Sequence, residues 1–180
     1  MTRAVAGHPR WKNGGMDVVV REARESELAE IGEVTAEVYA AESLVGPEYL
    51  AVLKDARARW TAPATKLLVA VDDGTDGLLG VVVYASPGSP LQDLAVGDEA
   101  EFRMLAVLEP ARGRGVGETL VRACITMAKQ GGHPRIVLST GPEMVAAHRL
   151  YERMGFTRTY DRDWAPRPGI NLLAYVMDFA

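Results

Sequence analysis

The sequence predicts an α+β fold in which a mixed, mostly antiparallel sheet is flanked by helices. Short runs of β-branched residues, which are typical of strands, alternate with longer segments whose apolar residues recur at helical spacing. The order of these segments along the chain is β-α-α-β-β-β-α-β-α-β-β. The chain has 180 residues and no repeats, and this length suits one domain, which we place at residues 16–180.

The N-terminal half is expected to contain a strand, two helices and a β-hairpin. Val18-Val19-Val20 is β-branched and favours a strand, whereas the apolar residues from Leu28 to Val38 recur at helical spacing. The turn-forming segment Asp72–Gly77 separates two apolar runs and predicts the hairpin. The expected elements are a strand at 18–21, a helix opening at 25–27, a helix over 49–59, and strands at 67–71 and 78–84.

The C-terminal half is expected to alternate strands with two helices. A long connection over 86–100 precedes it, and such a loop in a compact domain is usually functional or disordered. Gly155 should end the second helix, with Phe156 folding back onto Tyr151 or Leu150 in a Schellman cap. The expected elements are strands at 102–107, 136–138, 157–160 and 172–179, helices at 114–129 and 143–154, and a proline-rich loop around Trp164.

Composition and charge exclude several classes of protein. The chain carries 20 basic and 24 acidic residues, a net charge of -4, which argues against binding nucleic acid through phosphate neutralisation. Its longest apolar run, Leu78–Ala85, is far shorter than the ~18 residues of a membrane span. One cysteine excludes a disulfide framework and a cysteine-based zinc cluster. We therefore expect a cytoplasmic protein with no metal, no nucleic-acid partner and no membrane partner.

Residues 1–15 differ from the rest of the chain. They contain three basic residues, no acid, three glycines and one proline, and no apolar stretch of a secretory signal follows the positive charges. We expect a disordered N-terminal tail, with Met16 as an alternative start. The remaining residues are decidedly acidic.

The most informative segment is Glu101–Gly117, which reads EFRMLAVLEPARGRGVG. A strand leads through a short turn into a glycine-rich stretch where a helix begins, and such a helix N-terminus attracts a phosphate or pyrophosphate. Arg112 and Arg114 would add charge-assisted contacts. The alternative is an ordinary turn with two solvated arginines. The segment lacks the GKS or GKT of a P-loop and the glycine spacing of a Rossmann fingerprint.

Two motifs together resemble a known family. Arg112-x-x-Gly115-x-Gly117, after a strand ending in Leu105-Ala106-Val107, resembles the acyl-CoA signature of the GNAT superfamily of N-acetyltransferases. The second hallmark is Ala147 followed by Leu150-Tyr151-Glu152-x-x-Gly155-Phe156. The resemblance extends over residues 16–180 and includes the order of the elements.

The resemblance implies a GNAT-like fold that uses acetyl-CoA as cosubstrate and no metal. The strand at 101–107 would separate from the strand at 136–139, and the pantetheine arm would lie in that gap. The pyrophosphate would rest on the amides of residues 112–117, at a helix N-terminus. The implied cofactor-binding residues are Leu105, Ala106, Val107, Arg112, Gly113, Arg114, Gly115, Val116 and Gly117.

The resemblance also implies two catalytic residues. Tyr151 would protonate the departing thiolate, and Glu101 would help remove the proton of the acceptor ammonium, directly or through water. The alternatives are a core position for Tyr151 and a solvated surface charge for Glu101. Met144 stands where many family members carry asparagine, which removes one side-chain hydrogen bond near the cofactor.

The implied reaction is transfer of the acetyl group to a primary amine of a small molecule, peptide or protein, by direct attack in a ternary complex. The alternatives are transfer of another acyl group, transfer to an oxygen, and a CoA-binding sensor without catalysis. Because family members are often dimers, a homodimer is a further expectation that the resemblance implies. The acceptor is expected between the two N-terminal helices, the 86–100 loop and the C-terminal hairpin. Acidic residues of that loop hint at a cationic acceptor: Asp93, Asp98 and Glu99.

Three further groups of side chains are candidates for chemistry. Cys124 lies on the apolar side of a helix and is expected to be buried filler. His133 and His148 lack neighbours at metal-ligand spacing, so a structural or exposed position is expected. The loop residues Asp161, Asp163 and Trp164 could line the acceptor site, with plain exposure as the alternative.

Overall fold

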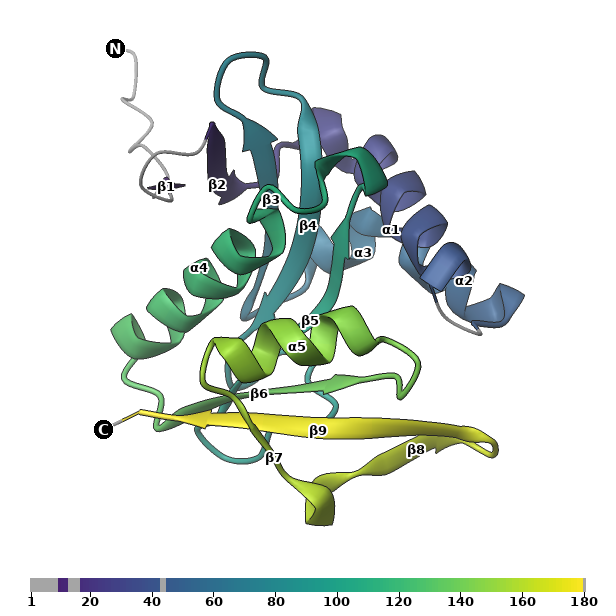
Figure 1. The fold of residues 1–180 in the computed structure, drawn as a ribbon, viewed down its shortest axis with the longest axis vertical. Helices are drawn as coiled ribbons and strands as arrows, with labels where there is room; N and C mark the ends of the chain where they lie inside the picture. Colours follow the sequence, from purple (N-terminus) through teal and green to yellow (C-terminus); the bar gives the residue numbers. More distant parts are fainter. Residues whose placement is uncertain (1–9, 13–16, 43–44, 180) are drawn as a thin grey trace.

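In the computed structural model, which describes residues 10–12, 17–42 and 45–179, a twisted sheet carries helices on both faces (Figure 1). The strand order is β1-β2-β3-β4-β5-β6-β9-β7, with β8 paired to β9. The strands are β1 (Trp11–Lys12), β2 (Val18–Glu22), β3 (Thr65–Asp72), β4 (Leu78–Ala85), β5 (Ala100–Val107), β6 (Arg135–Thr140), β7 (Thr157–Arg158), β8 (Trp164–Arg167) and β9 (Ile170–Asp178). The helices are α1 (Leu28–Glu42), α2 (Pro47–Lys54), α3 (Ala56–Thr61), α4 (Val116–Gln130) and α5 (Val145–Arg153).

Neighbouring strands are antiparallel except for β5 and β6, which are parallel. This arrangement confirms the predicted mixed, mostly antiparallel sheet flanked by helices. Among the described residues, no helix combines the length and the apolar character that crossing a bilayer requires.

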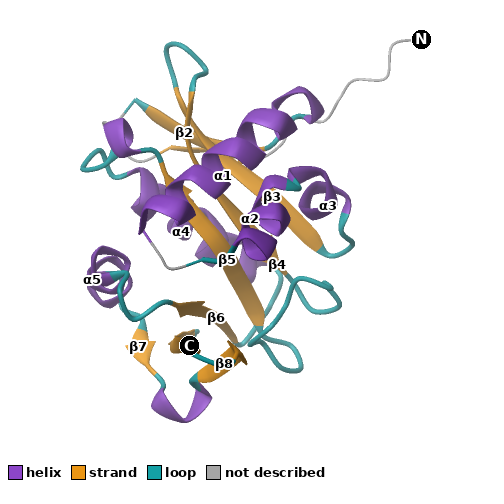
Figure 2. Cartoon of the chain, turned by 90° about the vertical axis from the view of Figure 1, so that its right-hand side faces the viewer, coloured by secondary structure: helices purple, strands orange, loops and turns teal. Residues whose placement is uncertain are grey.

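The sheet separates two hydrophobic cores, and Figure 2 shows helices on either side of it. Leu68 and Ala70 of β3 pack in the core under α4, while Val69 and Val71 pack in the core under α1, α2 and α3. Because side chains alternate between the two faces of a strand, burial of both faces makes β3 apolar at almost every position. The apolar runs of the sequence follow from this layering.

Strands β5 and β6 separate soon after they begin. They pair only at Ala100 with Ile136 and at Glu101 with Val137, among the residues the structure describes. Beyond this point each strand keeps only its outer neighbour, β4 for β5 and β9 for β6. The predicted gap between 101–107 and 136–139 is therefore present.

Three local predictions differ from the structure. The single helix expected over 49–59 is two helices, because Asp55 leaves helical geometry and its Oδ1 accepts the N–H of Ala58 to cap α3. The loop expected around Trp164 contains β8, which pairs with β9. Trp11 and Lys12, placed in the N-terminal tail, pair with β2, whereas residues 1–9 and 13–15 of that tail lie outside the described residues.

Other boundaries match the expectation within a few residues. Helix α5 ends in the predicted Schellman cap: Phe156 N–H donates to the oxygen of Tyr151, and Gly155 N–H donates to that of Glu152. Gly155 has a φ of 97°, which favours glycine. That residues 16–180 form one domain stays a prediction.

Candidate active site

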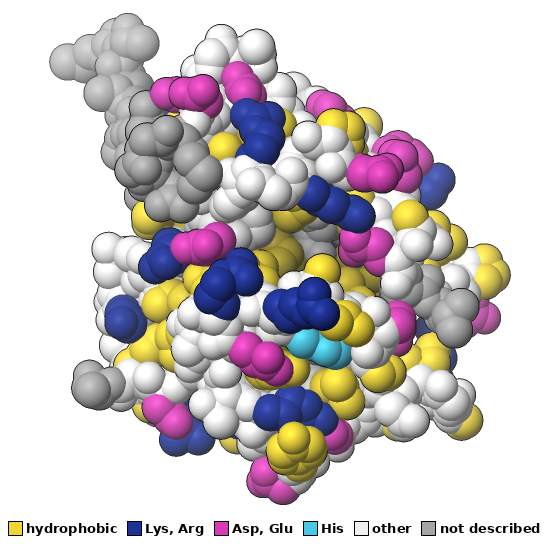
Figure 3. Space-filling view, in the orientation of Figure 1, with side chains coloured by type: hydrophobic (Ala, Val, Ile, Leu, Met, Phe, Trp, Pro, Cys, Tyr) yellow, Lys and Arg dark blue, Asp and Glu magenta, His cyan; other side chains and the backbone are white. Residues whose placement is uncertain are grey.

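A cavity of about 740 Å³ opens where β5 and β6 separate. Its walls come from the end of α1, the start of α4, helix α5 and the hairpin of β8 and β9. Figure 3 shows a hollow with hydrophobic side chains inside it and Lys or Arg side chains around its edge. The cavity therefore lies where the sheet opens between β5 and β6.

The glycine-rich turn before α4 forms one wall of this cavity. Gly113, Gly115, Val116 and Gly117 all line it. Gly113 and Gly115 have φ values of 76° and 72°, a left-handed conformation that L side chains rarely adopt. A Cβ on Gly117 would lie 3.3 Å from Leu150 Cδ2. The first turn of α4 thus presents backbone N–H groups without intrahelical partners to an approachable surface.

The two arginines of the turn have different surroundings. Arg112 lines the cavity and pairs with Glu42, the last residue of α1. Arg114 does not line it, because its Nη2 lies 3.1 Å from Asp72 Oδ2 in the β3–β4 turn. The structure therefore places Arg112, but not the side chain of Arg114, at the cavity, and contact of either arginine with the cofactor stays a prediction.

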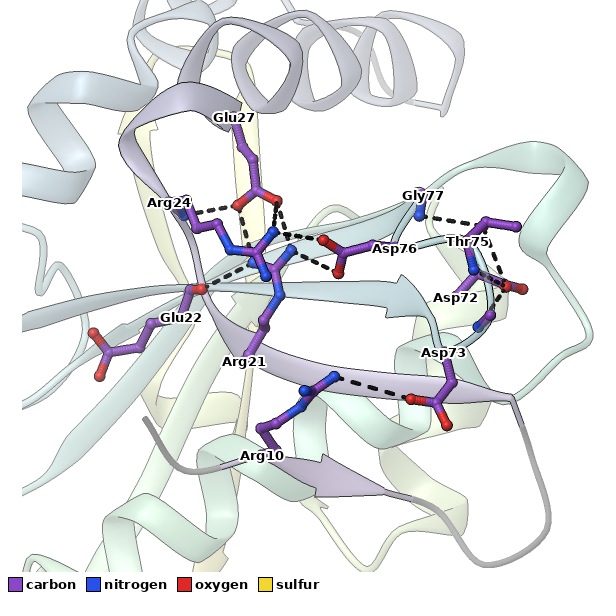
Figure 4. Close-up of polar contacts among 11 residues, drawn as sticks. Arg10, Arg21, Glu22, Arg24, Glu27, Asp72, Asp73, Thr75, Asp76 and Gly77 are labelled. Carbon is purple, nitrogen blue, oxygen red and sulfur yellow. Dashed lines mark hydrogen bonds and ion pairs between the residues drawn. The ribbon is translucent and has the colours of Figure 1, made fainter. Parts of the chain in front are cut away.

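The β3–β4 turn that holds Arg114 is itself well ordered by hydrogen bonds (Figure 4). Asp72 Oδ1 accepts the N–H groups of Gly74 and Thr75 at 3.1 Å. At the other end of the turn, Asp76 contacts Arg21 and Arg24, which also bind Glu27. Hydrogen bonds from Arg114 and Thr75 lower the pKa of Asp72, so its carboxylate stays charged at neutral pH.

Strand β5 is distorted where it faces the cavity. Met104 has a φ of 55°, an unusual value for a non-glycine residue, and the register with β4 shifts between Val81 and Val83. Leu105 and Val107 line the cavity, as predicted. Ala106 is 1% exposed and packs in the core under α1, so the prediction that it contacts the cofactor is not supported for its side chain.

Tyr151 of α5 lines the cavity from the opposite side. Its ring packs against those of Phe102, Phe156 and Tyr175 at centroid distances of 5.8, 5.9 and 5.9 Å. Burial is the main cause that raises its pKa well above the ordinary 10, so the hydroxyl is protonated across the neutral range. A phenol that is fixed in place and fully protonated can donate a proton at this wall.

Glu101 is placed differently from the prediction. It is 0% exposed, does not line the cavity, and its Oε2 accepts the N–H groups of Asp93, Leu94 and Ala95 at 3.0 Å each. Burial raises its pKa, and the three N–H donors oppose that effect. The alternative of a solvated surface charge disagrees with this position, whereas a role as base, directly or through water, stays a prediction. In the structure Glu101 holds the backbone of residues 93–95.

The acceptor end of the cavity, where the N-terminal helices, the 86–100 loop and the C-terminal hairpin contribute to its lining, is aromatic and charged. Tyr39, Tyr49 and Trp164 line it, together with Asp93 and Arg103. The rings of Tyr39 and Tyr49 lie 6.4 Å apart in an edge arrangement. Of these five residues, the sequence pointed only to Trp164 and Asp93. An arginine within the apolar strand FRMLAV was the available signal for Arg103.

The remaining candidates do not line the cavity. Cys124 is 0% exposed, and burial raises its pKa far above the usual value, as expected for core filler. His148 contacts the oxygen of Gly141 at 2.8 Å, and His133 contacts that of Asp98 at 3.0 Å, which fits structural roles. Asp163 pairs with Arg158 at 2.6 Å instead of facing an acceptor.

Comparison with known proteins identifies the family. A model of the acetyltransferase (GNAT) family matches residues 30–156. The chain belongs to the GNAT acetyltransferase family. Mycothiol acetyltransferase of Cellulomonas flavigena is 34% identical over 120 residues, which are 63% of this chain and 34% of that protein. The chain spans about a third of the length of the curated relatives that it matches first, 36% and 34%.

Solved structures share the GNAT fold with this chain. An acetyltransferase of the GNAT family from Staphylococcus aureus Mu50 superposes with a TM-score of 0.72 at 14% identity, covering 89% of this chain and 98% of the other. A putative acetyltransferase from Salmonella typhimurium, solved with its cofactor acetyl-CoA, has a TM-score of 0.61 at 18% identity, covering 90% and 94%. At these identities the likeness establishes the fold.

One GNAT position departs from the common pattern, as noted from the sequence. Met144 precedes α5 and lines the cavity. Its Sδ accepts from Thr140 Oγ1 at 3.7 Å. A thioether accepts hydrogen bonds only weakly, and Met144 contributes mainly apolar surface here.

Proposed function

We propose that this GNAT protein transfers the acetyl group of acetyl-CoA to a primary amine of a small molecule or peptide. The observation that carries the proposal is that one cavity joins three features: the glycine-rich turn at the start of α4, the opened edges of β5 and β6, and the hydroxyl-bearing ring of Tyr151. A phosphate site, a strand edge and a proton donor in one cavity suit an acyl-CoA substrate.

The residues present fit this cosubstrate. Gly113 and Gly115 hold left-handed backbone that side chains would strain, so amides from Arg112 to Gly117 can approach a pyrophosphate closely. Beyond Glu101, the inner edge of β5 has no strand partner among the described residues, so Leu105 and Val107 can bind an extended amide-containing arm through the backbone. Bound here, acetyl-CoA supplies an activated thioester.

Tyr151 acts as the general acid in this account. Its hydroxyl donates a proton to the sulfur as the acetyl group leaves, which general acid catalysis accelerates typically 10²–10⁴-fold. The edge contacts with Phe102 and Phe156 fix the ring, and Glu42 also helps to raise the pKa of the phenol. The proton therefore stays on Tyr151 until the sulfur takes it.

The acceptor amine must lose a proton before it attacks, because an alkylammonium has a pKa near 10. Glu101 does not line the cavity, so it does not take this proton directly. We assign the transfer to water, with Asp93 as the cavity carboxylate at the acceptor end. Since Cys124 is fully buried and does not line the cavity, we assign a direct attack within a ternary complex, with no acyl-cysteine.

Release of free thiol from acetyl-CoA tests this function. The protein is incubated with acetyl-CoA and a panel of primary amines, and thiol is measured with and without each amine. Amine-dependent release supports acetyl transfer. Binding of CoA without release for any amine supports a non-catalytic CoA sensor instead.

A further inference from the structure

Arg103 and Asp93 form an ion pair at the acceptor end of the cavity, and the backbone of the loop also binds Arg103. Arg103 Nη2 lies 2.6 Å from Asp93 Oδ2, and Arg103 Nη1 donates to the oxygen of Leu91 at 2.9 Å. The side chains are 17% and 33% exposed, so the pair is largely shielded while both residues line the cavity. It lies at the end lined by Tyr39, Tyr49 and Trp164.

The pair has capacity left for a ligand. A guanidinium carries five N–H donors in a planar fork, and a carboxylate accepts through two oxygens. Among the described residues, no hydrogen-bond donor is recorded for Asp93 Oδ1. Arg103 is hydrogen-bonded to Leu91 and pairs with Asp93 and, at 3.9 Å, with Glu101. The pair therefore presents unused donors next to an unused acceptor.

Glu101 positions both members of the pair. Its Oε2 accepts the N–H of Asp93 itself, and its Oε1 is buried without a hydrogen-bond partner, 3.9 Å from Arg103 Nε. The loop that carries Asp93 is held again at its far end, where Arg162 binds Glu99 and the oxygen of Leu94. Positions fixed in this way before binding favour a ligand of matching geometry.

Acidic side chains of the loop do not form a free negative surface. Asp93 is paired with Arg103, and Glu99 with Arg162 and Arg135. A polyamine would find these carboxylates already neutralised. A group that carries an ammonium and a carboxylate on one carbon matches an adjacent aspartate and arginine better.

Building on the proposed acetyltransferase function, we propose that the acceptor is an α-amino acid, its carboxylate bound by Arg103 and its amine directed by Asp93. The carboxylate takes the unused guanidinium N–H groups, and Asp93 Oδ1 accepts from the amine. Asp93, Arg103 and Tyr151 line the same cavity, so an amine held at this pair lies in the cavity that contains the proton donor. Asp93 and Arg103 are then specificity-determining residues.

Matched acceptors test the proposal. Thiol release is measured with L-leucine, L-leucinamide and 3-methylbutylamine, and with L-phenylalanine, its amide and 2-phenylethylamine. We expect kcat/KM to be at least about tenfold higher for each amino acid than for its amide and its amine, since a site built for a polar group rejects analogues that lack it. The amides lose their amine proton most readily, so a preference set by proton availability would favour them instead.

Variants assign the preference to a residue. Arg103→Gln should bring the ratio of kcat/KM between amino acid and amide close to one. Arg167→Gln is the control, because Arg167 lines the same cavity and pairs with Glu48, yet lies outside the pair; it should keep the ratio. A preserved rise of the melting temperature with CoA shows that each variant is folded.

The outcomes separate this proposal from the function on which it rests. Turnover of amines without preference for the carboxylate overturns the acceptor class and leaves acetyl transfer standing. A preference that survives Arg103→Gln and disappears in Arg167→Gln overturns the role of Arg103. CoA binding without turnover of any amine overturns both proposals. If Arg103→Gln does not fold, the ratios of the unmodified protein still decide the acceptor class.

Discussion

Tyr151 and Phe156 make two contacts, one between their rings and one between their backbones. Their rings meet edge to face at a centroid distance of 5.9 Å, and the oxygen of Tyr151 accepts the N–H of Phe156 at 3.0 Å. The cap that ends α5 therefore also fixes the ring whose hydroxyl lines the cavity. Helix geometry and the proposed chemistry depend on the same two residues.

Tyr151→Phe separates these two roles. The ring and the cap remain and only the hydroxyl is lost, so the melting temperature and CoA affinity should change little. We expect kcat to fall about 10²-fold, the lower end for general acid catalysis, because water partly replaces the phenol in an open cavity. KM should change much less, since the proton is needed mainly as the thiolate forms.

Tyr175→Phe is the matched control for that measurement. Tyr175 packs against Tyr151 at 5.9 Å, but its hydroxyl donates to Glu152 and it does not line the cavity. Its removal should leave kcat nearly unchanged. Normal turnover by Tyr151→Phe would demote Tyr151 to a packing residue, and loss of CoA binding would make it a cofactor contact.

Substitution of Gly115 tests the cofactor site. A hundredfold excess of CoA over its Kd stabilises the fold by ~2.7 kcal/mol, a melting-temperature rise of roughly 5–10 °C for a domain of this size. Gly115→Asp should abolish most of this rise, because it places a carboxylate and a Cβ at the pyrophosphate position. Thermal melts with and without CoA measure it.

Gly132→Asp controls for backbone strain. Gly132 lies beyond the other end of α4 with a φ of 71°, nearly equal to the 72° of Gly115. Both variants should have a lower melting temperature, but only Gly115→Asp should lose the rise in melting temperature that CoA causes. An unchanged response in Gly115→Asp would contradict the proposed pyrophosphate position. A flat response of the unmodified protein at millimolar CoA would contradict acyl-CoA binding altogether.

The pairing of Glu42 with Arg112 predicts competition with the cofactor. Both side chains are partly exposed, and such pairs contribute about 0.2–1 kcal/mol. If the pyrophosphate takes Arg112, it must displace Glu42, so Glu42→Gln should bind CoA up to about fivefold more tightly by calorimetry. Glu48→Gln, which breaks only the pair with Arg167, should leave the Kd unchanged. Weaker binding by Glu42→Gln would exclude competition.

Stability at low pH should depend on Glu99. Burial raises its pKa, but the hydrogen bonds from Arg162 and from the N–H of Val96 outweigh this and lower the pKa overall. A carboxylate with a lowered pKa stabilises the fold fully above its unfolded pKa of about 4.3 and progressively less as the pH falls through the folded value.

Melting temperatures between pH 7 and pH 3 measure this effect. Glu99→Gln should lower stability at pH 7 and flatten the decline below about pH 4.3, because the titrating group is gone. Glu37→Gln, on the exposed side of α1, should leave the decline unchanged. A decline just as steep in Glu99→Gln would show that other carboxylates control acid unfolding.

Most of the fold and half of the site were predictable from local patterns. These patterns depend only on neighbours in sequence: β-branched runs predicted strands, apolar residues at helical spacing predicted helices, and the glycines of 113–117 predicted the turn before α4. The break at Asp55 and the strand β8 were missed, because one depends on a single capping side chain and the other on pairing with β9.

The acceptor end could not be predicted for a physical reason. Tyr39, Asp93, Arg103 and Trp164 come from four separate segments, and only the folded chain brings them to one cavity. The burial of Glu101 could not be predicted, because its acidic neighbours Asp98 and Glu99 favoured a solvated position. Its contact with the N–H groups of residues 93–95 depends on how the loop folds back onto β5.

The masses of protein and amine after reaction with acetyl-CoA test the central claim most directly. The account predicts one acetylated amine for each thiol released and an unchanged protein mass, with or without amine, because Tyr151 moves only a proton and Cys124 is buried outside the cavity lining. Acetylated protein formed in the absence of amine, or thiol released without acetylated amine, would contradict direct transfer in this cavity.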